Sequence, residues 1–159
     1  QQLKDHIFHY QKTYFQKALT HVDESGYVSI GFLEGRLDHT LATLHVIQKH
    51  IQKRPILLYG LEDVILAASS DISVSLPIKE RLSLWPLGVV RFKSSTGLLY
   101  PLTDIQMSQG SQIGTSNVTC EETVQIRVSE QNKGTYLVII SKLYFKELFM
   151  LSDASAVPK

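Results

Sequence analysis

A short stretch, residues 35–42 (GRLDHTLA), carries a guanidinium, a carboxylate and an imidazole within four positions, as Arg36, Asp38 and His39. A carboxylate such as Asp38 is the oxygen ligand that Mg²⁺ prefers, and Mg²⁺ usually keeps phosphate oxygens and water as its other ligands. The planar guanidinium of Arg36 can clamp a phosphate with two hydrogen bonds. The stretch therefore predicts a phosphate and metal site. The alternative is that Asp38 complements a helix dipole while Arg36 is a surface charge.

The elements on either side of this stretch would position it. Residues 27–30 (YVSI) are rich in β-branched and aromatic residues and favour a strand. Residues 36–50 have helical periodicity. One apolar face of this helix is predicted to hold Leu37, Leu41, Leu44, Ile47 and Ile51. Arg36 and Asp38 then lie between the end of a strand and the first turn of a helix, where phosphate ligands collect in α/β proteins.

Three other segments carry groups suited to ligand binding. Thr13 is a good helix N-cap, and Lys17 one turn later can contact a phosphate. Tyr100 stands beside a proline and offers a ring on which a flat or cationic heterocycle can stack. Residues 110–117 form a predicted loop of glycines, hydroxyls and amides that can hydrogen-bond the polar edge of a heterocycle. An amphipathic helix start, a core tyrosine and a hairpin loop remain the alternatives.

Composition narrows the class of protein. The 159 residues are 43% hydrophobic and 19% charged, enough for a substantial core. The net charge of +1 gives no general electrostatic case for nucleic acid or an anionic membrane as partner. A single cysteine, Cys120, excludes an internal disulfide and a cysteine-rich zinc site. No apolar run approaches the roughly 20 residues needed to span a bilayer. We expect an intracellular, cytoplasmic protein.

Two regions of different pattern follow one another. Residues 1–60 alternate helix and strand, with helices at 12–24 and 36–50 and strands at 27–30 and 56–59. This pattern predicts part of a doubly wound α/β domain, and the chain's start without methionine suggests that the amino-terminal part of that domain is missing. Residues 61–151 predict an antiparallel β-sandwich or barrel, with short strands at 64–68, 72–76, 81–85, 89–93, 123–128 and 136–140. Residues 143–151 favour a terminal helix or an added strand, and 152–159 a polar tail.

Taken in order, four segments resemble motifs of the thiamine pyrophosphokinase (thiamin diphosphokinase) family. Residues 35–42 resemble its Gly-Arg-Phe/Leu-Asp-His/Gln signature, and residues 97–102 (GLLYPL) its Gly-Leu-Lys-Tyr/Trp-Pro/Asn-Leu segment. Residues 114–117 (GTSN) resemble its loop containing Ser-Asn, and residues 13–19 (TYFQKAL) the end of its Asp-Gln-x-x-Thr-Asp-Phe-x-Lys-Ala-Leu motif. The resemblance covers nearly the whole chain.

The resemblance implies an activity and an assembly. Enzymes of this family transfer a pyrophosphoryl group from ATP, their co-substrate, to the hydroxyethyl oxygen of thiamine and release AMP, with Mg²⁺ as cofactor. They are homodimers in which thiamine lies between the α/β domain of one subunit and the β domain of the other. The active site is thus expected at the subunit interface. Such catalysis relies on positioning and charge neutralisation.

The resemblance also assigns roles by position. Asp38 would be the metal ligand and, with Arg36, catalytic. The ATP phosphates would be bound by Thr13, Lys17, Arg36 and His39. The thiamine site would contain Tyr100, Thr115, Ser116 and Asn117, with Tyr100 lining the pocket and Ser116 and Asn117 hydrogen-bonding the pyrimidine.

Three residues depart from the family pattern. His9 and Tyr10 stand where its first motif has aspartate and glutamine, and Tyr14 stands at a second aspartate. Tyrosine cannot replace a carboxylate on Mg²⁺ at neutral pH. The family's Ala-Asp-Gly-Gly and Gly-Asp-x-Asp-Ser segments do not occur in the chain. The alternative is therefore a degenerate or truncated relative that binds thiamine or dimerises without catalysis. A third possibility is an unrelated α+β binding module.

Overall fold

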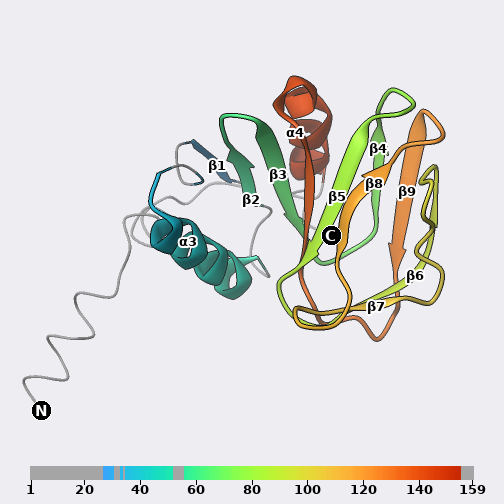
Figure 1. The fold of residues 1–159 in the computed structure, drawn as a ribbon, viewed down its shortest axis with the longest axis horizontal. Coiled ribbons are helices and arrows are strands. Elements are labelled where there is room, and N and C mark those ends of the chain that lie inside the picture. Colours follow the sequence, from blue (N-terminus) through green and yellow to red (C-terminus); the bar gives the residue numbers. More distant parts are fainter. Residues whose placement is uncertain (1–26, 31–32, 34, 52–55, 155–159) are drawn as a thin grey trace, which may run out of the picture.

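A computed structural model describes residues 27–30, 33, 35–51 and 56–154, which form ten strands, two α-helices and one 3₁₀ turn (Figure 1). The predicted helix at 12–24 and the candidates Thr13 and Lys17 lie outside these residues, as do His9, Tyr10 and Tyr14. Within the described part, no helix is both long and apolar enough to cross a membrane.

The larger sheet has six strands and carries the α/β part and the β part together. Its order is β1 (Tyr27–Ile30), β2 (Ile56–Tyr59), β3 (Asp63–Ala68), β10 (Tyr136–Ser141), β5 (Arg81–Pro86) and β8 (Gly114–Val118). Strands β1 and β2 are parallel and are connected through helix α3 (Leu37–His50). The other pairs are antiparallel. The sheet is therefore continuous across position 60, and the predicted division into domains there stays a prediction.

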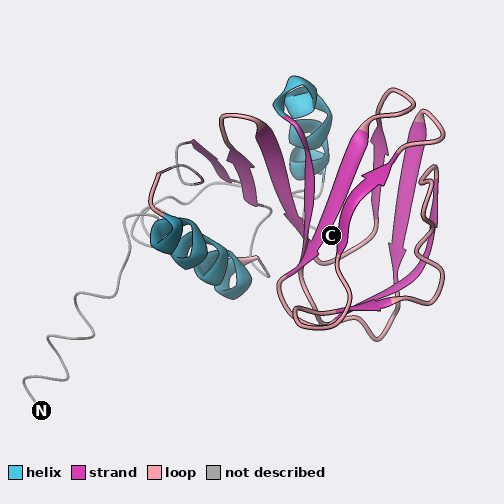
Figure 2. Ribbon diagram, in the orientation of Figure 1, coloured by secondary structure: helices cyan, strands magenta, loops and turns pink. Residues whose placement is uncertain are grey.

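The smaller sheet has four strands and packs on the larger one (Figure 2). Its order is β4 (Ile72–Ser75), β9 (Thr123–Val128), β6 (Val90–Thr96) and β7 (Gln106–Met107). A 3₁₀ turn, η1 (Lys142–Tyr144), leads into helix α4 (Phe145–Ala154), which contacts β2, β3 and β4. The structure thus has mostly antiparallel strands in two sheets with few helices, and this part of the predicted fold class is confirmed.

Alternation along the strands explains where the two hydrophobic cores lie. In β9, buried Val124 and Ile126 alternate with exposed Gln125 and Arg127, as expected of a strand with one face in the core. Strand β10 is apolar on both faces because each face is covered. Its Val138 and Ile140 belong to the core between the sheets, whereas Leu137 packs with α3.

The predicted apolar face of helix α3 is wrong in its first turns. Leu37 and Leu41 are 71% and 57% exposed, whereas Thr43, Val46 and Ile47 are buried. The reason is that the later turns, not the first, lie on the sheet, where Val46 and Ile47 join the cluster of β2 and β3 side chains. Thr43 tolerates burial because its hydroxyl donates to the carbonyl of His39 at 3.0 Å.

Other boundaries also differ from the sequence expectation. The loop predicted at 110–117 ends at Gly114, because residues 114–118 form β8 as the edge strand beside β5. The two-residue strand β7 has no counterpart in the prediction. Residues 143–151, for which helix and strand were both open, are helical from Phe145, and α4 continues three residues into the predicted tail.

Candidate functional site

The predicted phosphate turn is a surface turn at the amino end of α3. Gly35 has a φ of 83°, and Arg36 is the helix N-cap with extended backbone. The Arg36 guanidinium donates two hydrogen bonds to the Asp38 carboxylate, from Nε to Oδ1 at 3.0 Å and from Nη2 to Oδ2. Asp38 Oδ1 also accepts from the backbone N–H of His39 at 3.0 Å.

These contacts keep both side chains charged. The hydrogen bond from Arg36 lowers the pKa of the Asp38 carboxyl, and the same pair raises the pKa of the Arg36 guanidinium. The side chains of Arg36 and Asp38 are 73% and 61% exposed, and an exposed ion pair is worth little. A phosphate or a metal ion can therefore displace one partner from the other at small cost.

A single carboxylate fits part of a magnesium site. Mg²⁺ is often held by one or two carboxylates together with substrate phosphates, so Asp38 is a suitable ligand. Among the described residues, no three His, Cys, Asp or Glu side chains are grouped as metal ligands. His39 is exposed beside Asp38.

The second group of candidates surrounds a small pocket between the turn after β6 and the start of β8. The pocket has a volume of about 180 Å³ and is lined by Tyr100, Pro101, Leu102, Ile105, Met107, Gln112, Ile113, Gly114, Thr115 and Asn117. Tyr100 is 64% exposed at its edge. Ligand pockets usually enclose roughly 300–1,000 Å³, so this one holds only part of a small ligand unless another surface completes it.

Asn117 does not project freely into this pocket. Its carboxamide is buried and bonds both backbone polar groups of one residue, because Oδ1 accepts from Tyr100 N at 3.1 Å and Nδ2 donates to Tyr100 O at 2.7 Å. Oδ1 also accepts from Val118 N at 2.9 Å. Asn117 therefore fixes the backbone of Tyr100, and through it the position of the ring.

Two further bonds fix the turn that carries Tyr100. Leu99 N donates to Val118 O at 2.8 Å, and Leu102 N donates to Ser95 Oγ at 2.9 Å. Gly97 has a φ of 76°, and a Cβ there would lie 2.3 Å from Thr123 O. Glycine is thus required at position 97, the first residue of the segment 97–102, because its backbone packs closely against that of Thr123.

Ser116 stands apart from the pocket lining. It has a φ of 61°, and its N–H donates to Ser83 Oγ at 3.0 Å beside an irregularity between Leu82 and Leu84 of β5. The pocket brings together Tyr100, Thr115 and Asn117 from the predicted set. Gln112 and Ile113 fall within the predicted loop 110–117, whereas the sequence reasoning missed Ile105 and Met107. Only their closeness along the chain to residues 97–102 and 114–117 could have indicated them.

The two groups of candidates are far apart within one chain. In Figure 1 the amino end of α3 lies at the left, whereas β6, β7 and β8 lie on the right beyond β5. The described residues therefore do not bring Arg36 and Asp38 to the pocket of Tyr100.

The region that contains the pocket is similar to a domain of known proteins. Residues 69–132 match the family model described as thiamin pyrophosphokinase, vitamin B1 binding domain. Thiamin pyrophosphokinase 1 of Caenorhabditis elegans is 27% identical over 124 residues, covering 72% of this chain and 49% of that protein. Thiamine pyrophosphokinase 1 of Oryza sativa subsp. japonica is 32% identical over 102 residues, covering 61% and 39%. These matches indicate the thiamine pyrophosphokinase family.

Fold comparison agrees with the family. A solved thiamin pyrophosphokinase family protein from Enterococcus faecalis superposes with a TM-score of 0.64 at 27% identity, over 80% of this chain and 60% of that one. The predicted resemblance to thiamine pyrophosphokinases is confirmed. The chain spans about half the length, or less, of the curated relatives it matches. The vitamin B1 binding match contains Tyr100, Thr115, Ser116 and Asn117, whereas Arg36, Asp38 and His39 precede it.

Proposed function

We propose that this chain acts as a thiamine pyrophosphokinase, an enzyme that transfers pyrophosphate from ATP to the thiamine hydroxyl and yields thiamine diphosphate and AMP. The observation that carries the proposal is the position of the Tyr100 pocket within the residues that match a vitamin B1 binding domain. The charged turn at Arg36 and Asp38 supports the phosphate-transfer half of the reaction.

At the thiamine end, the ring of Tyr100 would stack on thiamine, whose thiazolium is a flat cation. Thr115 and Gln112 line the same pocket and can hydrogen-bond a polar ring edge. The bonds of Asn117 to Tyr100 favour a positioning role for this amide. The proposed contact of Ser116 with the pyrimidine stays a prediction.

At the phosphate end, Asp38 would hold Mg²⁺ and Arg36 would neutralise phosphate charge, with His39 beside them. Bound Mg²⁺ supplies charge stabilisation to the phosphate oxygens. Asp38 is exposed and pairs with Arg36, so a bound Mg²⁺ would take the place of that guanidinium while Arg36 turns to the phosphates. Thr13 and Lys17 are proposed as further phosphate contacts, by family resemblance alone.

We infer that the working unit is a homodimer with its active site at the subunit interface. The separation of the two groups of candidates and the small volume of the pocket support this, because a second subunit can bring its α3 turn to the pocket. In this proposal, β1, α3 and β2 form the last β-α-β unit of a doubly wound α/β domain. The enzyme is proposed to be cytoplasmic.

The test of the function is an assay of AMP release from Mg-ATP with and without thiamine. We expect AMP and thiamine diphosphate in equal amounts, and only when thiamine is present. Thiamine binding without AMP release would instead establish the degenerate relative. A protein that does neither would overturn the family function altogether.

The change Asp38→Asn is expected to lower AMP release at least about 100-fold, because charge stabilisation of phosphates is usually the largest catalytic contribution. Thiamine affinity, measured by calorimetry, should stay within about twofold. Glu121→Gln, at an exposed carboxylate outside both groups, is the matched control and should change neither value. Equal losses in rate and affinity would show that Asp38 is only a structural cap.

Mixing two impaired variants, at a thiamine concentration well below the dissociation constant of Tyr100→Ala, tests the shared site. Asp38→Asn and Tyr100→Ala impair opposite halves, so a mixed dimer contains one doubly impaired site and one intact site. Refolding the two variants together should restore about a quarter of the wild-type rate by random pairing. No recovery, with mixed dimers confirmed by mass spectrometry, would contradict a site shared between subunits.

A further inference from the structure

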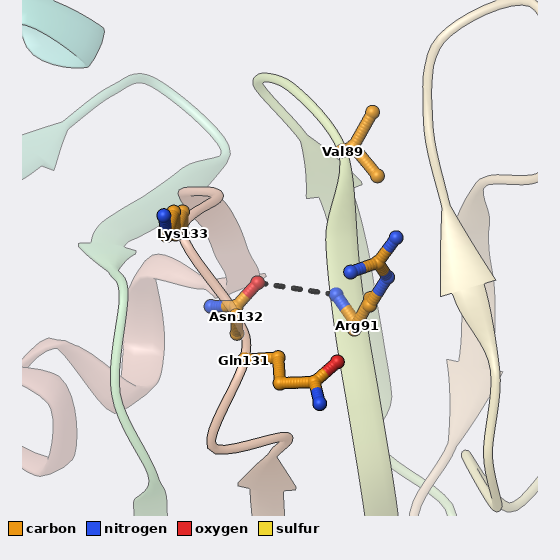
Figure 3. A pocket seen from close by; sticks show the side chains of 5 residues that line it. All are labelled: Val89, Arg91, Gln131, Asn132 and Lys133. Atoms are coloured by element: carbon orange, nitrogen blue, oxygen red, sulfur yellow. Dashed lines mark hydrogen bonds between the residues drawn. The ribbon is translucent and has the colours of Figure 1, made fainter.

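A second cavity lies at the opposite end of β6 from the Tyr100 turn. Its volume is about 550 Å³, and it is lined by Val89, Arg91, Gln131, Asn132 and Lys133 (Figure 3). Arg91 stands near the start of β6, roughly 20 Å along the strand from the Tyr100 turn at its end. The two pockets share no lining residue, although Met107 of the Tyr100 pocket pairs with Val90 next to Arg91. This volume falls within the range of ligand pockets.

The walls of this cavity are fixed. In Figure 3 the loop bearing Gln131, Asn132 and Lys133 faces the strand bearing Val89 and Arg91. The Asn132 carboxamide accepts from Arg91 N and Gly134 N at 3.1 and 3.2 Å and donates to Ser69 O and Gly134 O at 3.2 and 3.0 Å. The loop needs glycine at 134 because a Cβ there would lie 2.0 Å from Val89 O.

The charges at this cavity are of one sign. Its lining contains two cations and no carboxylate. Arg36 and Arg81 each have an acidic partner, but within the described ranges Arg91 and Lys133 have none. The Arg91 Nε donates to the neutral Gln106 Oε1 at 3.0 Å, which orients the guanidinium without cancelling its charge. The exposed wall as a whole, the two cationic side chains included, is mostly carbon.

We propose that this cavity binds a phosphate monoester with an apolar or flat organic group, at a site separate from the thiamine pocket. Arg91 and Lys133 take the phosphate, since an arginine fork suits two phosphate oxygens. Gln131 offers a further donor, and Val89 with the aliphatic stems of the two cations contacts the organic group.

The test is a titration of ¹⁵N-labelled protein with phenyl phosphate, followed by amide chemical shifts. We expect saturable shifts confined to residues 89–91 and 131–134, unchanged by added thiamine, and affinity at least about tenfold above that of inorganic phosphate. The double variant R91M/K133M should weaken binding at least about tenfold. K133M alone, on the loop and remote from the core, should weaken it about threefold or more.

K93M is the matched control, because Lys93 is an exposed cation on the same strand outside the cavity. It should leave the affinity within about twofold. Shifts that do not saturate, inorganic phosphate binding as tightly as the ester, or equal weakening by K93M would each overturn the proposal. Circular dichroism of each variant confirms that its fold is retained.

Discussion

Replacing Gly97 by alanine is expected to cost about 3 kcal/mol of unfolding free energy. About 1 kcal/mol comes from holding a residue with a side chain at a φ of 76°. The rest comes from the new Cβ, which would lie 2.3 Å from the carbonyl oxygen of Thr123, a backbone atom that cannot move aside without disturbing β9. Urea unfolding at equilibrium measures this loss.

The chain provides a matched control at Gly110. This glycine also has a positive φ, 81°, but nothing lies within 4 Å of its Cβ position. Gly110→Ala should therefore cost only about 1 kcal/mol. Equal losses at Gly97 and Gly110 would show that the crowding against Thr123 contributes nothing. The same Gly97→Ala change should weaken thiamine binding, because Gly97 begins the turn that carries Tyr100.

Replacing Asn117 by alanine is expected to lower both stability and thiamine affinity. The change leaves the N–H and C=O of Tyr100 and the N–H of Val118 without their side-chain partner, and unsatisfied buried groups cost about 1–3 kcal/mol each. Because all three bonds are only partly buried, we expect about 2–3 kcal/mol in total. Thiamine affinity at 10 °C, where the variant remains folded, should fall about tenfold, as measured by calorimetry.

The variant Ser116→Ala tests whether Ser116 contacts thiamine directly, in contrast to Asn117, which positions Tyr100. Ser116 is exposed, so its hydroxyl can be removed for less than about 0.5 kcal/mol of stability. A loss of thiamine affinity in this variant alone would identify Ser116 as a ligand contact. If Asn117→Ala lowered affinity but left the unliganded protein as stable as before, the positioning role of Asn117 would be contradicted.

The apolar strands were predicted well because a run of apolar residues between turn residues is visible in the local sequence alone. Strands β2, β3 and β10 are apolar runs between turn residues, and the structure buries them on both faces or within the sandwich. Strand β8 could not be predicted in this way. Its sequence, Gly-Thr-Ser-Asn-Val, has the composition of a loop, and only the ladder offered by β5 makes it a strand.

The candidate site shows the same limit at the level of side chains. The sequence indicated that Tyr100 and Asn117 belong near each other only through a family resemblance, and it could not show that the Asn117 amide bonds the backbone N–H and C=O of Tyr100. Likewise, helical periodicity placed Leu37 and Leu41 on the buried face, but which turns of α3 meet the sheet depends on tertiary packing. Close backbone approach at Gly97 is equally invisible without the neighbouring strand.

The central claim, that the pocket beside Tyr100 is a thiamine site, is tested most directly by calorimetric titration of thiamine into the wild-type protein and into Tyr100→Ala. We expect saturable binding of one thiamine per chain by the wild type. We expect a loss of at least about tenfold in Tyr100→Ala, because a cation over an aromatic ring contributes about 2 kcal/mol when desolvated. Absence of binding to the folded wild-type protein, or unchanged affinity in Tyr100→Ala, would contradict it.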